Sequence, residues 1–409
     1  MLWKKTRWFW KSGFAIISFI LAFGVSGCTV VPEEETEIQE DENVALDIED
    51  DADEMKDICL DLYEKASEEN KLADLETIRS IVNRFGEYGY SAIDSKNQVD
   101  MTMAEQIVLF CDAVEQKKVA ETIVFQIDYF GGFIKYDLKT EDGNVEVTKS
   151  YYVYEDKEIQ RKSVSSYLAK KWDYTEEGYM MFSGSYYSET LYALTLSAEE
   201  DYVALRVEPL AEKYRELNRK YLLPIGYACN NMFITDWNES DFGDLNFYDL
   251  FDIFYSEVYK SPFSYMPDDN LGVRAVYHIP NEDFEHVIQT YFNIDSKTLQ
   301  SKTVYCQEDS TYEYKPRGFE EVEYPEYPYP EVIGYTENND STITLMAQVV
   351  FPYKGDSNVY AHEVTVRPLD NGGVQYVSNK IIPSEDNGEV SWHTPRLTED
   401  EWEELYGGQ

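Results

Sequence analysis

Residues 122–154 read TIVFQIDYFGGFIKYDLKTEDGNVEVTKSYYVY, and this stretch decides the expected fold. Val, Ile, Tyr and Phe alternate with polar residues over three runs, which is the period of strands with one buried face. The breaks at Gly131-Gly132 and at Asp142-Gly143-Asn144 carry the residue types of hairpin turns. The stretch therefore predicts consecutive antiparallel strands in a β-meander, and similar strand patterns follow at 179–187 and 202–207.

Upstream of the meander, apolar residues recur at helical spacing. The spacing predicts helices over 55–66, 75–85 and 103–119. Thr102, with Glu105 three residues later, predicts a capping box at the start of the third helix. Helices followed by a meander indicate an α+β domain, which we place at residues 57–209.

The rest of the chain repeats this order. Pro209 and Pro224 bracket a helical segment, which puts the domain boundary near residue 210. Further helices are predicted over 245–259 and 281–292, and strands over 332–336, 342–351, 359–368 and 374–382. The expected fold is therefore α+β with two tandem domains, and the second domain covers residues 210–383.

Two proline-rich or polar segments flank the last strands. Residues 323–331 read EYPEYPYPE, which favours polyproline II conformation and an exposed loop before an edge strand. Residues 384–409 form a polar tail with a short helix predicted to be capped at Thr398. The tail either docks on the folded body or remains loose.

The start of the chain has the order of an export signal. A basic segment, residues 1–12, precedes an apolar stretch at 14–25 that ends in Val25-Ser26-Gly27-Cys28. This order resembles the lipobox of bacterial lipoprotein signal peptides, and the apolar stretch is shorter than the ~20 residues that span a bilayer. We expect residues 1–27 to be cleaved off between Gly27 and Cys28. Lipid on the Cys28 sulfur, including palmitate, then anchors the protein on the extracytoplasmic face of the cell membrane.

Acidic residues dominate the segment that follows. Thirteen of residues 33–54 are Asp or Glu, and none is Lys or Arg. Such a run cannot bury a core and repels itself, so residues 28–56 are predicted to be a disordered tether. A cation-binding tail is the alternative interpretation. The whole chain carries a formal charge of −44, which excludes nucleic acid as a partner because polyanions bind to clustered Lys and Arg.

Four cysteines remain besides Cys28, too few for a disulfide-stapled scaffold. Cys59 and Cys111 lie among apolar residues of predicted helices, whereas Cys229 and Cys306 lie in unrelated segments. We interpret all four as buried free thiols. A disulfide between Cys59 and Cys111 is the alternative, because export exposes the chain to oxidising conditions.

No motif for metal or cofactor chemistry stands out. The histidines have no ligand spacing of a zinc enzyme, and the odd-position oxygens from Asp236 to Ser240 lack the glycine and glutamate of a calcium loop. Ser183-Gly184-Ser185 does not match a nucleophile elbow, and the Tyr167 to Lys171 spacing lacks a dinucleotide motif beside it. We therefore predict no metal and no cofactor. The four histidines are His278, His286, His362 and His393.

Paired carboxylates leave one catalytic interpretation open. Glycoside hydrolysis needs two carboxyl groups about 5–10 Å apart, and the 79 acidic residues offer many pairs without singling one out. The 35 tyrosines either stack on sugar rings or fill strands, where tyrosine is favoured.

Two segments resemble uncharacterised lipoproteins of anaerobic Gram-positive gut bacteria. They are RKYLLPIGYACNNMF at 219–233 and HEVTVRPLDNGGVQYVSN at 362–379, and the resemblance extends over residues 210–383. It implies a lipoprotein of unknown function and no catalytic residues. The leading hypothesis is a non-catalytic binding or envelope-complex module that contacts a protein or a glycan. The alternative is a carboxylate-based hydrolase of glycans or cell wall.

Overall fold

The computed structural model describes residues 51–187, 192, 196–266, 275–323 and 326–406. Asp50–Gln409 form one compact unit of helices and mostly antiparallel sheets, which confirms the predicted α+β class. The expected signal peptide and all but the last residues of the expected tether lie outside the described residues. The boundary near residue 210 remains a prediction.

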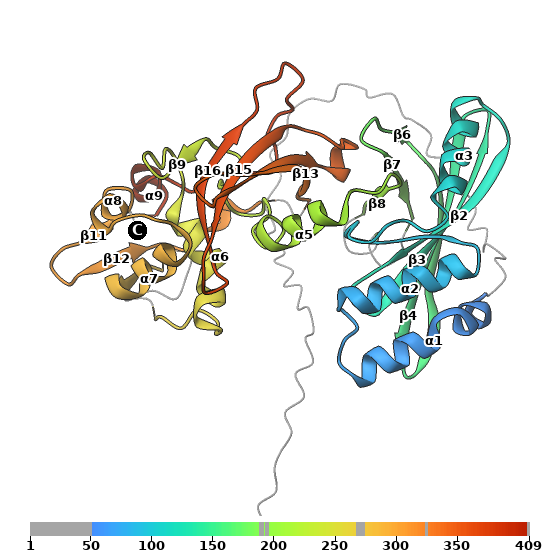
Figure 1. The fold of residues 1–409 in the computed structure, drawn as a ribbon, viewed down its shortest axis with the longest axis horizontal. Coiled ribbons are helices and arrows are strands. Elements are labelled where there is room, and N and C mark those ends of the chain that lie inside the picture. Colours follow the sequence, from blue (N-terminus) through green and yellow to red (C-terminus); the bar gives the residue numbers. More distant parts are fainter. Residues whose placement is uncertain (1–50, 188–191, 193–195, 267–274, 324–325, 407–409) are drawn as a thin grey trace, which may run out of the picture. The chain divides into compact units, whose positions relative to one another are not determined.

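Two helices open the folded region, α1 (Ala52–Glu68) and α2 (Leu75–Glu87) (Figure 1). The first begins inside the acidic run, because Asp53 and Glu54 lie in its first turn, where the helix dipole favours negative charge. The last residues of the expected tether are therefore helical.

The predicted meander is confirmed and extended by a strand on each side. The sheet has the order β1-β2-β3-β4-β5, with β1 parallel to β2 and the other neighbours antiparallel. Asp142 and Gly143 join β3 to β4 with φ of 53° and 84°, the backbone of a tight hairpin turn that glycine favours. The strands are β1 (Ser91–Asp94), β2 (Ala120–Ile127), β3 (Gly132–Glu141), β4 (Asn144–Glu155) and β5 (Glu158–Leu168).

Both faces of this sheet carry apolar side chains. Phe125 and Phe133 pack with the apolar stripes of α1 and α2 in one core cluster. Their neighbours along the chain point the other way, as alternation in a strand requires, so Val124 packs in a second cluster with α3 (Ala104–Glu115). That cluster also contains residues of the sheet β6-β7-β8, formed by β6 (Lys171–Tyr174), β7 (Tyr179–Tyr186) and β8 (Glu199–Arg206).

The predicted capping box of α3 is wrong. The helix begins after Met103, and no side chain caps it. The Thr102 hydroxyl instead accepts from the backbone N–H of Ala92 at 3.0 Å and donates to Tyr90 O at 3.1 Å. Thr102 is thus used to join the helix start to β1, a strand that the sequence pattern did not predict.

The second half holds the other predicted meander. Its strands have the order β13-β14-β15-β16-β9, and the strands β10, β12 and β11 form a separate small sheet. One large core cluster joins these sheets to α5, α6 and α7. The helices are α5 (Glu212–Tyr221), α6 (Phe247–Tyr259), α7 (Asn281–Tyr291), α8 (Ser296–Ser301) and α9 (Glu399–Tyr406). The strands are β9 (Trp237–Asn238), β10 (Tyr277–Pro280), β11 (Tyr305–Cys306), β12 (Thr311–Tyr314), β13 (Tyr329–Glu337), β14 (Ile343–Val350), β15 (Ala361–Pro368) and β16 (Val374–Ile381).

The segment at 323–331 is not the exposed loop that its prolines predict. Residues 324–325 lie outside the described part, but the carboxylates on both sides of them are buried. Glu323 accepts from the backbone N–H of Cys229 at 2.7 Å, and Glu331 pairs with Arg206. The ion pair between Glu331 on β13 and Arg206 on β8 connects this edge strand to the neighbouring sheet. The prediction of an edge strand is confirmed.

The polar tail docks on the folded body. The predicted cap at Thr398 is confirmed: its hydroxyl accepts from the N–H of Glu401, whose carboxylate accepts in return from the N–H of Thr398 at 2.8 Å. Before this helix, Trp392 is buried and Arg396 pairs with Asp249 at the start of α6.

Candidate binding groove beside strand β2

The groove forms where β2 lacks a neighbouring strand. β1 pairs with β2 only from Val124 to Ile127, whereas β3 pairs with β2 along its whole length. Over residues 120–123, β2 therefore has β3 on one side and, in the described part of the chain, no strand on the other. An unpaired strand edge presents backbone N–H and C=O groups to solvent.

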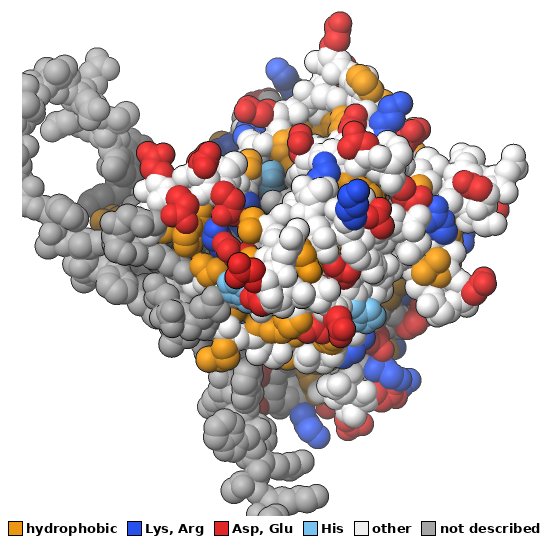
Figure 2. Space-filling view, turned by 90° about the vertical axis from the view of Figure 1, so that its left-hand side faces the viewer, with side chains coloured by type: hydrophobic (Ala, Val, Ile, Leu, Met, Phe, Trp, Pro, Cys, Tyr) orange, Lys and Arg blue, Asp and Glu red, His pale blue; other side chains and the backbone are white. Residues whose placement is uncertain are grey.

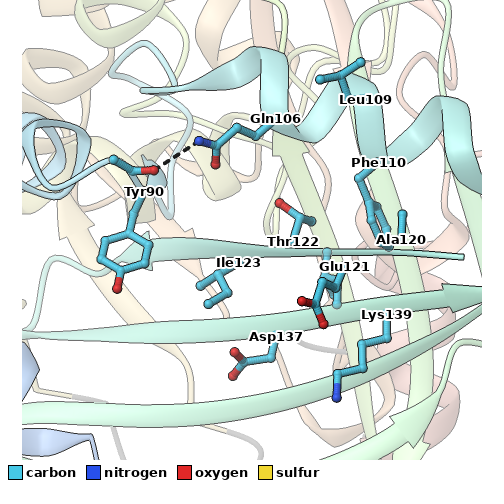
Figure 3. Close-up of a pocket in the computed structure, with 12 residues that line it drawn as sticks. Tyr90, Gln106, Leu109, Phe110, Ala120, Glu121, Thr122, Ile123, Asp137 and Lys139 are labelled. Atoms are coloured by element: carbon cyan, nitrogen blue, oxygen red, sulfur yellow. Dashed lines mark hydrogen bonds between the residues drawn. The ribbon is translucent and has the colours of Figure 1, made fainter.

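A hollow of about 560 Å³ lies along this edge (Figure 3). Helix α3 lies on one side of it and contributes Gln106, Leu109 and Phe110, while β2 and β3 supply the opposite side. The Gln106 amide donates to Gly89 O at 3.1 Å and so connects α3 to the segment before β1. The lining residues are Gly89, Tyr90, Gln106, Leu109, Phe110, Ala120, Glu121, Thr122, Ile123, Asp137, Leu138 and Lys139.

The groove combines apolar surface with charges of both signs. Leu109 is 67% exposed, although it lies on a helix whose other large apolar side chains are mostly buried. Asp137 lies on the opposite side, 3.3 Å from Lys135, which also pairs with Asp51 at 2.7 Å. Burial raises the pKa of the Asp137 carboxyl above its usual range, and the Lys135 charge opposes this effect.

A second hollow, of about 760 Å³, continues from the groove across the sheet and shares Ala120, Glu121 and Lys139 with it. The strand register places four side chains in one row across β2 to β5, and all four are exposed. They are Glu121, Lys139, Glu146 and Leu168. Edge and open face together form a surface suited to an extended chain or a flat ligand.

The expected lipidation site, Cys28, and the expected cleavage point between Gly27 and Cys28 lie outside the described residues. The remaining four cysteines are free, so the alternative of a disulfide between Cys59 and Cys111 does not hold. These two thiols are buried as predicted, but Cys229 is exposed and Cys306 is partly exposed. The prediction of burial is wrong for them because Cys229 lies in a surface turn and Cys306 ends the short strand β11.

The sequence did not single out the groove residues, although one signal was present. Leu109 is a large apolar residue that does not belong to the buried stripe of α3, and the structure shows it exposed. Away from the groove, the fold also brings His278, Cys306 and Asp309 together, with metal-ligating atoms all within 4.8 Å of one another. His278 lies far before Cys306 and Asp309 in the sequence, so a search by spacing did not find this cluster.

Comparison with known proteins gives a family and no activity. A family model described as a family of unknown function (DUF6070) matches residues 45–396. No curated protein matches the chain. No solved structure matches it either.

Proposed function

Because the chain belongs to the DUF6070 family, whose function is unknown, we propose a function from its sequence and its groove. The protein is a lipid-anchored binding module on the extracytoplasmic face of the cell membrane. It holds an extended segment of a partner protein against the open edge of β2 and catalyses no reaction.

The anchor rests on the order of residues at the start of the chain. Val25-Ser26-Gly27-Cys28 resembles a lipobox, and residues 29–50 separate Cys28 from the start of the described fold. Among the described residues, no helix is both long and apolar enough to cross a membrane. Lipid on Cys28 supplies a membrane attachment that needs no spanning helix.

The observation that carries the binding function is the unpaired edge of β2 at 120–123 beside the exposed Leu109. A strand of a partner can form backbone hydrogen bonds with such an edge. A neighbouring exposed apolar side chain adds an apolar contact for the side chains of that strand. The groove is open, about 560 Å³ in volume and carries both charges. These properties favour recognition of a chain over enclosure of a small substrate.

The test places a photo-crosslinking amino acid at residue 109 in the living cell. Phe130 is the matched control, because it is also a large apolar residue, 90% exposed, in the loop between β2 and β3. We expect a single protein adduct from position 109 and none from position 130, and we expect Leu109→Glu to weaken capture of that partner. Equal adducts from both positions would contradict a binding surface at the groove.

One observation favours the alternative of a carboxylate-based hydrolase. Glu121 pairs with Lys139 and Ile123 pairs with Asp137, so the two carboxylates are diagonal neighbours on adjacent strands. Side chains of diagonal neighbours on adjacent strands can reach one another, and the carboxyl groups of an inverting glycosidase pair lie about 6.5–9.5 Å apart. The raised pKa of Asp137 suits a general acid. Release of reducing ends from cell-wall glycans that disappears in Asp137→Asn would replace the binding module with this enzyme.

A further inference from the structure

A second candidate site lies on the small sheet β10-β12-β11. β11 and β12 form a hairpin in which Cys306 pairs with Thr311, and Asp309 lies in the turn between them. On the other side of β12, His278 of β10 pairs with Glu313. The hairpin and the neighbouring strand thus bring an imidazole nitrogen, a thiol sulfur and a carboxylate oxygen within 4.8 Å of one another.

Hydrogen bonds already hold two of these ligand groups in place. Thr311 Oγ1 lies 2.9 Å from His278 Nδ1 and donates to Asp309 Oδ1 at 2.7 Å. His278 Nδ1 lies 3.4 Å from the other oxygen of Asp309. The turn itself is fixed to α7, because Ser310 O accepts from the N–H of Asn281 at 3.0 Å. Because these side chains are already held in place, they lose less conformational entropy when a metal binds.

The donor set selects the class of cation. Ca²⁺ and Mg²⁺ prefer oxygen ligands throughout, whereas thiolate and imidazole favour zinc and related transition metals. Two ligands separated by two residues in a hairpin, with a third from elsewhere, are a common arrangement in zinc sites. The strongly negative chain also raises the local concentration of cations at its surface.

We propose that His278, Cys306 and Asp309 bind a zinc-class divalent cation with three protein ligands. A fourth, tetrahedral position faces solvent, because Asp309 is exposed and the other two side chains are partly exposed. This open position takes water or a ligand from a partner. Coordination replaces the proton of the Cys306 thiol, which passes to the solvent, and no oxidation or reduction takes place.

The site lies on an accessible face. Figure 2 views the molecule from the side on which β11 and β12 lie in Figure 1, and it shows histidine side chains at the surface among acidic ones. Acidic side chains also bind cations weakly through their oxygen atoms. A test therefore has to report on sulfur coordination.

Co²⁺ is the probe, because thiolate bound to Co²⁺ gives a charge-transfer absorption band that oxygen ligands do not give. The full-length chain with Cys28→Ala is titrated in detergent under reducing conditions. We expect the thiolate band to saturate at one equivalent and Zn²⁺ to displace the Co²⁺. We expect Cys306→Ser to abolish the band, and His278→Asn to weaken Co²⁺ binding at least tenfold.

Cys229→Ser is the matched control, because Cys229 is the other accessible thiol of the described residues and lies outside the cluster. It is expected to leave the band and the affinity unchanged. Far-UV circular dichroism of Cys306→Ser verifies that the variant is folded. Binding without a thiolate band means that only carboxylates hold the ion, and it overturns the proposal. Loss of the band in Cys229→Ser with retention in Cys306→Ser also overturns it.

Discussion

His362 on β15 is expected to stay neutral far below the pH at which a free histidine becomes charged. Its side chain is fully buried, with Nδ1 2.7 Å from Asn379 Oδ1 and Nε2 2.8 Å from the Tyr227 hydroxyl. An amide oxygen only accepts, so Nδ1 carries the proton and Nε2 accepts from Tyr227. Burial lowers the pKa of His362 from 6.5 to about 4, and the bond to Asn379 opposes this shift.

This shift links stability to pH with a definite sign. Between pH 6.5 and pH 4 the unfolded chain binds a proton at His362 and the folded chain does not. The stabilisation is therefore fully present above pH 6.5 and is lost as the pH falls toward 4. With ~1.36 kcal/mol for each pKa unit, the His362 contribution to this loss is about 3 kcal/mol.

The measurement is the free energy of unfolding by urea at pH 7 and at pH 4, for the wild-type chain and for His362→Gln. The decrease between the two pH values is expected to be about 3 kcal/mol smaller in the variant, because the glutamine amide cannot titrate. His286→Asn, at an exposed position on α7, is expected to keep the wild-type decrease. The reasoning is refuted if His362→Gln loses as much stability as the wild type, or if the His362 ring titrates by NMR at pH 6 or above.

Further predictions concern an ion pair, a helix cap and the anchor. Glu331→Gln leaves the buried charge of Arg206 unpaired and is expected to lower the free energy of unfolding by about 3 kcal/mol or more. In the exposed Glu257–Lys260 pair, the control Glu257→Gln is expected to cost under about 1 kcal/mol. Asn246→Ala removes the acceptor for two N–H groups at the start of α6, a loss of about 1 kcal/mol by urea unfolding. Cys28→Ala is expected to abolish labelling by radioactive palmitate and to release the protein from the membrane fraction.

Each of these predictions has an outcome that would contradict it. An equal loss of stability in Glu331→Gln and Glu257→Gln would mean that burial does not determine how much an ion pair contributes to the free energy of unfolding. Unchanged stability in Asn246→Ala would mean that water replaces the cap without cost. Label and membrane association that persist in Cys28→Ala would remove the proposed anchor.

Elements with strong local patterns were predicted well from the sequence. The residue types predicted β14 and β16 within one residue at each end, because both runs are rich in β-branched and aromatic residues and are bounded by turn residues. β5 was missed. Its residues, EIQRKSVSSYL, are mostly polar because the strand lies at the edge of its sheet and few of its side chains are buried.

Contacts between distant segments could not be predicted from any local pattern. Thr102 has the sequence of a cap, yet it pairs with β1, since a hydroxyl bonds to whichever backbone group the fold brings near. Glu331 belongs to a proline-rich segment that favours exposure, yet Arg206, far away in the chain, draws it into the interior.

The pattern expected of an export signal, the acidic run, the helices with apolar stripes and the turn at Asp142 can be recognised from a few neighbouring residues. Their physical causes are local: side-chain period, backbone preference and charge repulsion. The groove beside β2 and the cluster of His278, Cys306 and Asp309 exist only in the folded chain. Strand pairing decided both, since it left one stretch of β2 without a neighbour and brought β10 beside the β11–β12 hairpin.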